Sequence, residues 1–120
     1  MVKVNGGTIL IVEDDAGVAR LQQKQLQRAG YDVVCAGTAE DAMRQVQEQQ
    51  PDLILLDYVL PGEITGLRLY ERLKEAGHNV PVIMVTGSPE AARQRHPALR
   101  VLGKPVAPDD FEQAVSEATG

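Results

Sequence analysis

Two short apolar segments of the chain end in carboxylate side chains. Residues 9–12 are followed by Glu13 and Asp14, and residues 53–56 are followed by Asp57. Carboxylates that lie close together repel one another and raise one another's pKa, so a hard divalent cation such as Mg2+ is the natural way to keep all of them ionised. If the two segments are neighbouring parallel strands, their carboxyl ends share one sheet edge, and we expect Glu13, Asp14 and Asp57 to hold Mg2+ there.

Two further polar residues, Thr86 and Lys104, follow later apolar segments. The combined set is sufficient for phosphoryl transfer, because acids hold the metal, the metal and an ammonium neutralise phosphoryl oxygens, and a hydroxyl donates to the remaining oxygen. A carboxylate is then the nucleophile. We expect that role for Asp57, which lies in the centre of the predicted sheet, because the adjacent Glu13 and Asp14 are better placed to hold the ion.

Each of these residues has a simpler explanation when it is taken alone. An aspartate after a strand often caps the next helix, and we expect that role for Asp15. Thr86, which precedes a glycine, could be a turn residue, and Lys104 could be a solvated surface charge. Four separate loops would seldom place complementary groups at one sheet edge by chance, so the joint placement favours a functional site.

The elements that position these residues alternate between strand and helix. Apolar runs bounded by polar residues are typical of strands buried on both faces, and i, i+3, i+4, i+7 spacing indicates amphipathic helices. Strands joined by helices form a parallel sheet covered on both faces, so we predict an α/β fold of the (βα)5 doubly wound type. The predicted strands are 9–12, 32–36, 53–57, 82–85 and 101–102, and the helices are 16–29, one that begins after Thr38, one that ends at Gly77, a short 88–96 and one that begins at Pro108.

The helical spacing also predicts which helix residues face the core. The inward residues are expected to be Val18, Leu21, Leu26 and Ala29 in the first helix, Leu69, Tyr70, Leu73 and Ala76 in the third, and Phe111, Ala114, Val115 and Ala118 in the last.

Composition limits the class of protein. A chain of 120 residues with 43% apolar content has the size of one domain, which we expect to span residues 1–120. The net charge of -5 disfavours direct binding of nucleic acid, and no apolar stretch approaches a membrane span or a signal-peptide core, so we expect a cytoplasmic protein without membrane insertion. A single Cys35 in an apolar run is expected to be a core residue.

The ordered motifs resemble the receiver domain of response regulators in bacterial two-component signalling, over essentially the whole chain. The fold implied is the flavodoxin-like receiver fold. The residues that carry the resemblance are 9–15 (ILIVEDD), Asp57 with Leu60-Pro61 behind it, Gly66-Leu67, Val85-Thr86-Gly87 and Lys104-Pro105.

The resemblance implies that Asp57 takes a phosphoryl group from a phosphohistidine of a histidine kinase or a histidine phosphotransfer protein. Asp14 would bind Mg2+ directly, Glu13 would help through water, and Asp57 and the backbone carbonyl of Val59 would complete the protein ligands. Such a domain is a phosphoacceptor that assists its own phosphorylation and dephosphorylation rather than an enzyme acting on a separate substrate.

The resemblance also implies a signalling switch that acts on a downstream effector the sequence does not name. Thr86 would move to the phosphoryl oxygen and Lys104 would pair with it. The peptide bond between Lys104 and Pro105 would be cis. Phosphorylation adds roughly -1.5 to -2 charges at one point, which can shift a loop that has two states.

Three features depart from the family pattern. Val101 stands where the family usually has Tyr or Phe, so an aromatic switch coupled to Thr86 is absent in its usual form. The interval from Thr86 to Lys104 is shorter by about one helical turn, which predicts a stunted fourth helix and disfavours dimerisation through the usual face. The loop 60–66 is one residue longer. These traits are more similar to receivers of hybrid histidine kinases than to those of transcription factors.

Three other functions were weighed against a phosphoaccepting receiver. A binding module that works without phosphorylation would be favoured if Asp57, Asp14 or Lys104 were replaced, and none is. A phosphohydrolase of the haloacid-dehalogenase type needs a second aspartate two residues after the nucleophile, where this chain has Val59. A nucleotide-binding domain is disfavoured because Gly6-Gly7 precede the first strand and no phosphate-binding loop follows it.

Overall fold

The computed structural model describes residues 7–58, 60 and 65–119, and within them strands and helices alternate as predicted. Strand bounds agree with the predictions to within one residue at either end. The first helix ends at Arg28, one residue before the predicted end, and the second continues from Ala39 to Gln49. The elements in chain order are β1 (Thr8–Val12), α1 (Ala16–Arg28), β2 (Asp32–Ala36), α2 (Ala39–Gln49), β3 (Leu53–Asp57), α3 (Gly66–Glu75), β4 (Val82–Thr86), α4 (Pro89–Arg95), β5 (Arg100–Gly103) and α5 (Pro108–Thr119).

The five strands form one parallel sheet in the order β2-β1-β3-β4-β5. A helix lies between every two consecutive strands, which is the connection that parallel pairing requires. The chain moves from β1 outward to β2 and then returns to β3 on the other side of β1. The order therefore reverses between β1 and β3, and ligands of open α/β sheets bind outside the carboxyl ends of strands at such a point.

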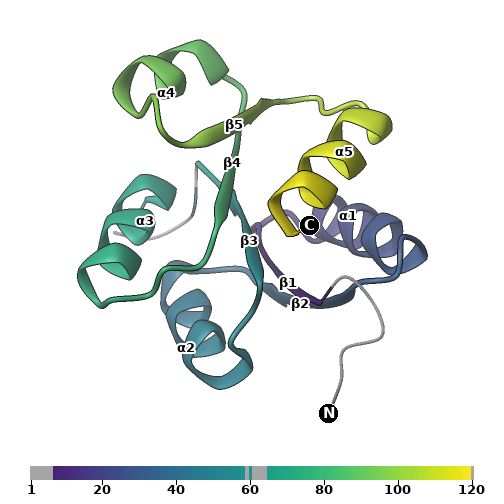
Figure 1. Cartoon of the computed structure of the whole chain (residues 1–120), viewed down its shortest axis with the longest axis horizontal. Coiled ribbons are helices and arrows are strands. Elements are labelled where there is room, and N and C mark those ends of the chain that lie inside the picture. The colour runs from purple at the N-terminus through teal and green to yellow at the C-terminus, as the bar shows by residue number, and fades with distance from the viewer. Residues whose placement is uncertain (1–6, 59, 61–64, 120) are drawn as a thin grey trace.

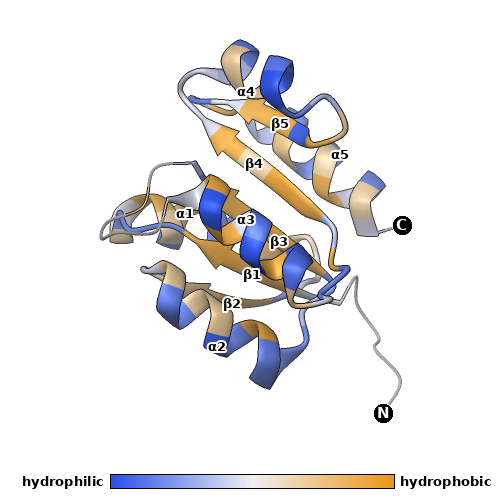
Figure 2. Cartoon of the chain, turned by 90° about the vertical axis from the view of Figure 1, so that its left-hand side faces the viewer, coloured by the Kyte–Doolittle hydropathy of each residue, from blue (hydrophilic) through white to orange (hydrophobic). Residues whose placement is uncertain are grey.

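Helices cover both faces of the sheet, with α1 and α5 on one side and α2, α3 and α4 on the other (Figure 1). Side chains of each central strand alternate between the two resulting cores, so Ile9 and Ile11 pack under α1 and α5 while Leu10 and Val12 pack under the other three helices. The strands are the most apolar elements (Figure 2), as expected for strands buried on both faces. None of the helices in the described part of the chain is long and apolar enough to cross a membrane.

Side-chain caps fix where the helices at the site begin. The Asp15 carboxylate accepts hydrogen bonds from the backbone N–H groups of Gly17 (2.9 Å) and Val18 (3.1 Å), which confirms its predicted capping role and separates it from its acidic neighbours. Thr38 and Thr65 cap α2 and α3 in the same way, through the N–H groups of Asp41 and Arg68.

The predicted inward face of α1 is wrong in part. Leu21 is 73% exposed and Val18 is 37% exposed, and Ala29 is exposed beyond the end of the helix. Leu26 is buried as predicted, and Ala19 is the other residue of the helix in the core. Gln22, Gln23 and Gln25 are half-buried beside them, and Val18 and Leu21 are left on the exposed side of the helix.

The inward residues of α3 and α5 are largely confirmed. Leu69 and Leu73 are buried and Tyr70 is partly buried, but Ala76 is exposed because the helix ends at Glu75 and Ala76 is its C-cap. The four residues predicted to face inward from α5 all belong to the core that lies between the sheet and the helices α1 and α5. The short α4 has 7 residues, in agreement with the shortened interval between Thr86 and Lys104.

Candidate phosphoacceptor and cation site

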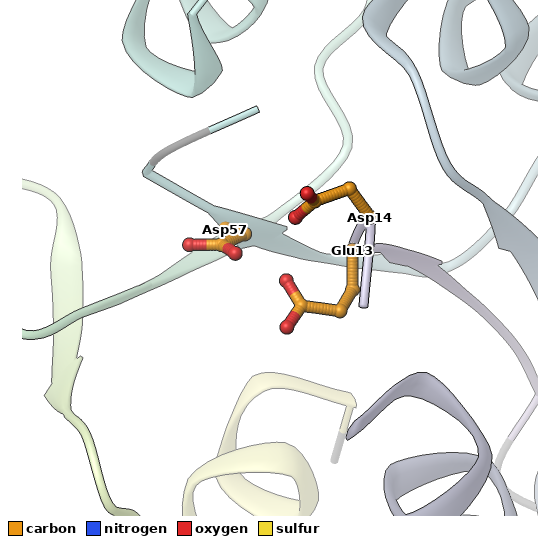
Figure 3. Close-up of side chains that lie close together, drawn as sticks. All are labelled: Glu13, Asp14 and Asp57. Atoms are coloured by element: carbon orange, nitrogen blue, oxygen red, sulfur yellow. The ribbon is translucent and has the colours of Figure 1, made fainter. Parts of the chain in front are cut away.

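Three carboxylates converge at the carboxyl ends of β1 and β3. Glu13 and Asp14 directly follow β1, and Asp57 is the last residue of β3, which pairs with β1. One oxygen from each lies within 4.8 Å of the other two, and the close-up shows the side chains extending toward a common region (Figure 3). Glu13 and Asp57 are buried, whereas Asp14 is exposed.

Lys104 is the cation that balances this cluster. Its Nζ donates a hydrogen bond to Asp57 Oδ2 at 3.0 Å and lies 3.7 Å from Glu13 Oε1. The Lys104 backbone N–H donates to the carbonyl of Thr86 at 2.8 Å, and the bond to Pro105 is cis, as the resemblance implied. Burial lowers the pKa of Lys104, but the hydrogen bond to Asp57 and the charges of Asp57 and Glu13 outweigh it, so the pKa is raised and the ammonium stays charged.

Glu13 is the carboxylate of the cluster whose ionised form is disfavoured. Its pKa is raised to about 8, most of all by burial and further by the hydrogen bond to Asp57 and the charges of Asp57 and Asp14, while the charge of Lys104 lowers it. Its Oε2 is buried and has no hydrogen-bond partner among the described residues. A bound cation would supply the missing compensation, and three carboxylates form the hard oxygen donor set that suits Mg2+.

Thr86 lies at the same edge of the sheet, at the end of β4, and is buried. Its Oγ1 accepts a hydrogen bond from the backbone N–H of Ser88 at 3.1 Å, which holds the start of the loop before α4. Asp57 pairs in register with Val85, so Thr86 extends one residue beyond this pair. Val59, the predicted carbonyl ligand, lies outside the described residues.

One residue at the site was missed by the sequence reasoning. Gln22 of α1 lines a small cavity together with Glu13, Asp57 and Lys104. It lies four residues after Val18, so a glutamine on the predicted inward face of α1 was the signal, and it was missed because only the apolar residues of that face were named.

The chain belongs to the response regulator receiver domain family, whose model matches residues 9–116. Receiver domains accept phosphoryl groups in two-component signalling, with a phosphohistidine donor and Mg2+ as the usual reactants, and this chain is such a phosphoaccepting domain. The predicted fold class and family are confirmed. Membership decides against the phosphohydrolase and the nucleotide-binding alternatives.

Individual relatives agree with the family assignment. The chain is 33% identical over 103 residues to the alkaline phosphatase synthesis transcriptional regulatory protein PhoP of Bacillus subtilis, covering 86% of this chain and 40% of the relative. It is 36% identical over 108 residues to the phosphate regulon transcriptional regulatory protein PhoB of Pseudomonas aeruginosa, covering 88% and 44%. The chain thus spans less than half the length of these relatives.

The fold agrees with a solved receiver domain. The receiver domain of NtrX from Brucella abortus superimposes with a TM-score of 0.83 at 27% identity, covering 92% of this chain and 97% of that one. The similarity to receivers of hybrid histidine kinases stays a prediction.

Proposed function

We propose that Asp57 is the phosphoacceptor of this receiver domain, and that Glu13, Asp14 and Asp57 hold Mg2+ beside it. The observation that carries this proposal is the convergence of the three carboxylates, with oxygens within 4.8 Å of one another, together with the Lys104 ammonium 3.0 Å from Asp57 Oδ2. Asp14 is exposed, and so is accessible to a cation that arrives from solvent. The carbonyl of Val59 is proposed as a further ligand.

The proposed reaction transfers a phosphoryl group from nitrogen to oxygen. A carboxylate oxygen of Asp57 attacks the phosphorus, the P–N bond to the donor histidine breaks, and the histidine nitrogen keeps the electron pair of that bond. Bound Mg2+ would neutralise charge on the phosphoryl oxygens. Lys104 faces Asp57 and contributes a fixed positive charge to the same oxygens. The product is an acyl phosphate on Asp57, and the same groups are proposed to assist its hydrolysis.

The proposed output begins at Thr86. Its hydroxyl oxygen now accepts from the N–H of Ser88, and donation of its proton to a phosphoryl oxygen on Asp57 would turn the side chain toward the site. Loss of that contact would free the start of the loop before α4. Histidine kinases or histidine phosphotransfer proteins are the proposed donors, and the effector that reads the loop is a separate partner or a segment beyond this chain.

The test is Mg2+-dependent phosphorylation by a small acyl phosphate such as acetyl phosphate, followed by intact mass. We expect one added phosphoryl group on the wild-type chain and none on Asp57→Asn, since the amide is not a nucleophile for this transfer. The added mass should disappear with EDTA. A wild-type chain that stays unmodified, or an Asn variant that gains the same mass, would contradict the proposal and would favour a binding module that works without phosphorylation.

A further inference from the structure

We propose that the contact between Arg93 and the backbone of Val101 holds α4 on β5 in the unphosphorylated chain and opposes the movement that phosphorylation starts at Thr86. This inference rests on the proposed phosphorylation of Asp57. It goes beyond that function because it assigns a regulatory role to a residue outside the cluster of carboxylates and lysine. Removal of the Arg93 guanidinium should shift the chain toward its phosphorylated conformation.

The start of α4 is held by Thr86 and not by a side-chain cap of its own. The Ser88 side chain, which precedes the helix, makes no capping hydrogen bond, whereas α1, α2 and α3 each have a side-chain cap. The Ser88 N–H instead donates to the Thr86 hydroxyl oxygen at 3.1 Å, and Pro89, the first residue of α4, follows directly. A Thr86 side chain that turns to a phosphoryl oxygen would therefore release the first turn of the helix.

Little apolar surface holds α4 once its first turn is released. The helix has 7 residues, and Ala92 is the residue that it buries. Ala92 belongs to the same core as Leu99 and Val101. Because an alanine side chain buries little area, a polar contact between α4 and β5 is a sizeable part of the attachment of the helix.

That polar contact joins Arg93 to the open edge of the sheet. β5 is the last strand in the order, so it pairs with β4 on one side and with no described strand on the other. The Lys104 N–H faces β4 and donates to the Thr86 carbonyl, so by the alternation of a strand the carbonyl of Val101 faces the open edge. Arg93 Nη2 donates to this carbonyl at 3.0 Å. One guanidinium thus ties the second turn of α4 to β5, beside which the helix lies (Figure 1).

Val101 itself offers no side-chain switch. It is 6% exposed, and a valine has no ring that could swing between the core and the surface. α4 therefore contacts β5 here through a backbone carbonyl, which can be bound or released by Arg93. A contact that is present in one of two states stabilises that state, so it lowers the affinity of the chain for a ligand of the other state.

The experiment compares the full chain with Arg93→Met in affinity for beryllofluoride, an analogue of a phosphoryl group, in the presence of Mg2+ and by backbone amide NMR shifts. We expect Arg93→Met to bind about five-fold more tightly, which corresponds to the loss of one ordinary hydrogen bond from the unliganded state. Loss of a positive charge would by itself weaken binding of this anion, so the expected gain has the opposite sign to a simple electrostatic effect.

Arg95→Met is the matched control. Arg95 lies on the same helix and makes none of the hydrogen bonds or ion pairs found within the described residues, so this variant loses the same charge without losing the contact. Its beryllofluoride affinity should not rise. Without beryllofluoride, hydrogen exchange of the α4 amides should be faster in Arg93→Met than in Arg95→Met, because the helix opens more readily when the contact is absent.

Thr86→Val tests whether the contact acts through the loop before α4. Valine has the shape of threonine without the hydroxyl, so Arg93→Met should change the affinity by no more than about two-fold in this background. Unchanged or weaker binding by Arg93→Met, an equal gain or equal α4 exchange in Arg95→Met, or a gain that persists with Thr86→Val would overturn the inference while leaving the phosphoacceptor site intact. A wild-type chain that binds no beryllofluoride would instead overturn the proposed function and this inference with it.

Discussion

Glu13 and Lys104 are neighbouring groups of opposite charge at the site. Within the described residues, two buried carboxylates lie within 4 Å of one ammonium, so the cluster carries more negative than positive charge when both are ionised. The protein resolves this by favouring the protonated form of Glu13, whose pKa is raised to about 8. A divalent cation would replace that proton, so the metal-free and metal-bound states should differ in their response to pH.

The stability of the metal-free chain should therefore carry a pH dependence that originates at Glu13. Between the ordinary pKa of 4.5 and about 8, folded Glu13 keeps its proton while unfolded Glu13 has lost it, so the free energy of unfolding falls as pH rises through this window. The slope from one proton is at most about 1.4 kcal/mol per pH unit.

Urea unfolding of wild type and Glu13→Gln in EDTA at several pH values measures this contribution. The stability of the wild type relative to the Gln variant should decrease from pH 5 to pH 8, because the variant cannot titrate at this position. A difference that stays constant over this range, or grows, would show that Glu13 is ionised throughout.

At the scale of elements, the strands could be predicted because a short run of apolar residues is typical of a strand buried on both faces. The run that ends at Asp57 is apolar at every position, so its bounds and its terminal carboxylate follow from the sequence alone. The face of α1 was not predictable in the same way. Leu26 was predicted inward and is buried, but packing of the helix against β1 and β2 buries the small Ala19 and leaves the larger Val18 and Leu21 exposed.

The sequence reasoning also missed Gln22, which lines a small cavity with Glu13. It lies four residues after Val18, so the predicted inward face of α1 already included its position, but only the apolar residues of that face were named. Carboxylate positions were predictable because strand ends fix them, but the side chain that approaches from a helix depends on tertiary packing, which local spacing does not determine.

The junction between β3 and α3 makes Gly66 indispensable to the geometry of Asp57. Its N–H donates to the carbonyl of Tyr58 at 3.1 Å, and a Cβ at this position would clash with the carbonyl oxygen of Asp57 and lie 2.9 Å from that of Tyr58. We expect Gly66→Ala to lower the free energy of unfolding by about 1–3 kcal/mol, as overpacking against backbone does.

Gly37→Ala is the matched control for that substitution. A Cβ at Gly37 would meet only the carbonyl oxygen of Glu13, at 4.0 Å, which is ordinary contact. Urea unfolding of the two variants should therefore show a loss for Gly66→Ala alone, accompanied by slower phosphorylation because the end of β3 must move. Equal stability of both variants would mean that α3 can shift without disturbing the strand.

At the scale of the whole molecule, both helical layers pack on the same sheet. One core lies under α1 and α5 and the other under α2, α3 and α4 (Figure 1), and β1 and β3 contribute side chains to both. A cation held by Glu13, Asp14 and Asp57 would join the ends of these two central strands. Its binding energy would therefore act on the cooperative unfolding of the entire chain.

Mg2+ should accordingly stabilise the chain as a ligand of the folded state. The gain follows RT ln(1 + [Mg2+]/Kd), or about 2.7 kcal/mol at 100 times Kd, and should raise the melting temperature in proportion to the logarithm of Mg2+ concentration. Asp14→Ala should abolish most of this gain. In EDTA the same variant should be at least as stable as the wild type, since Asp14 is exposed and its removal relieves repulsion within the cluster. Thermal melts of both chains across a Mg2+ series measure these effects, and an equal Mg2+ response in the Ala variant would place the cation elsewhere on the molecule.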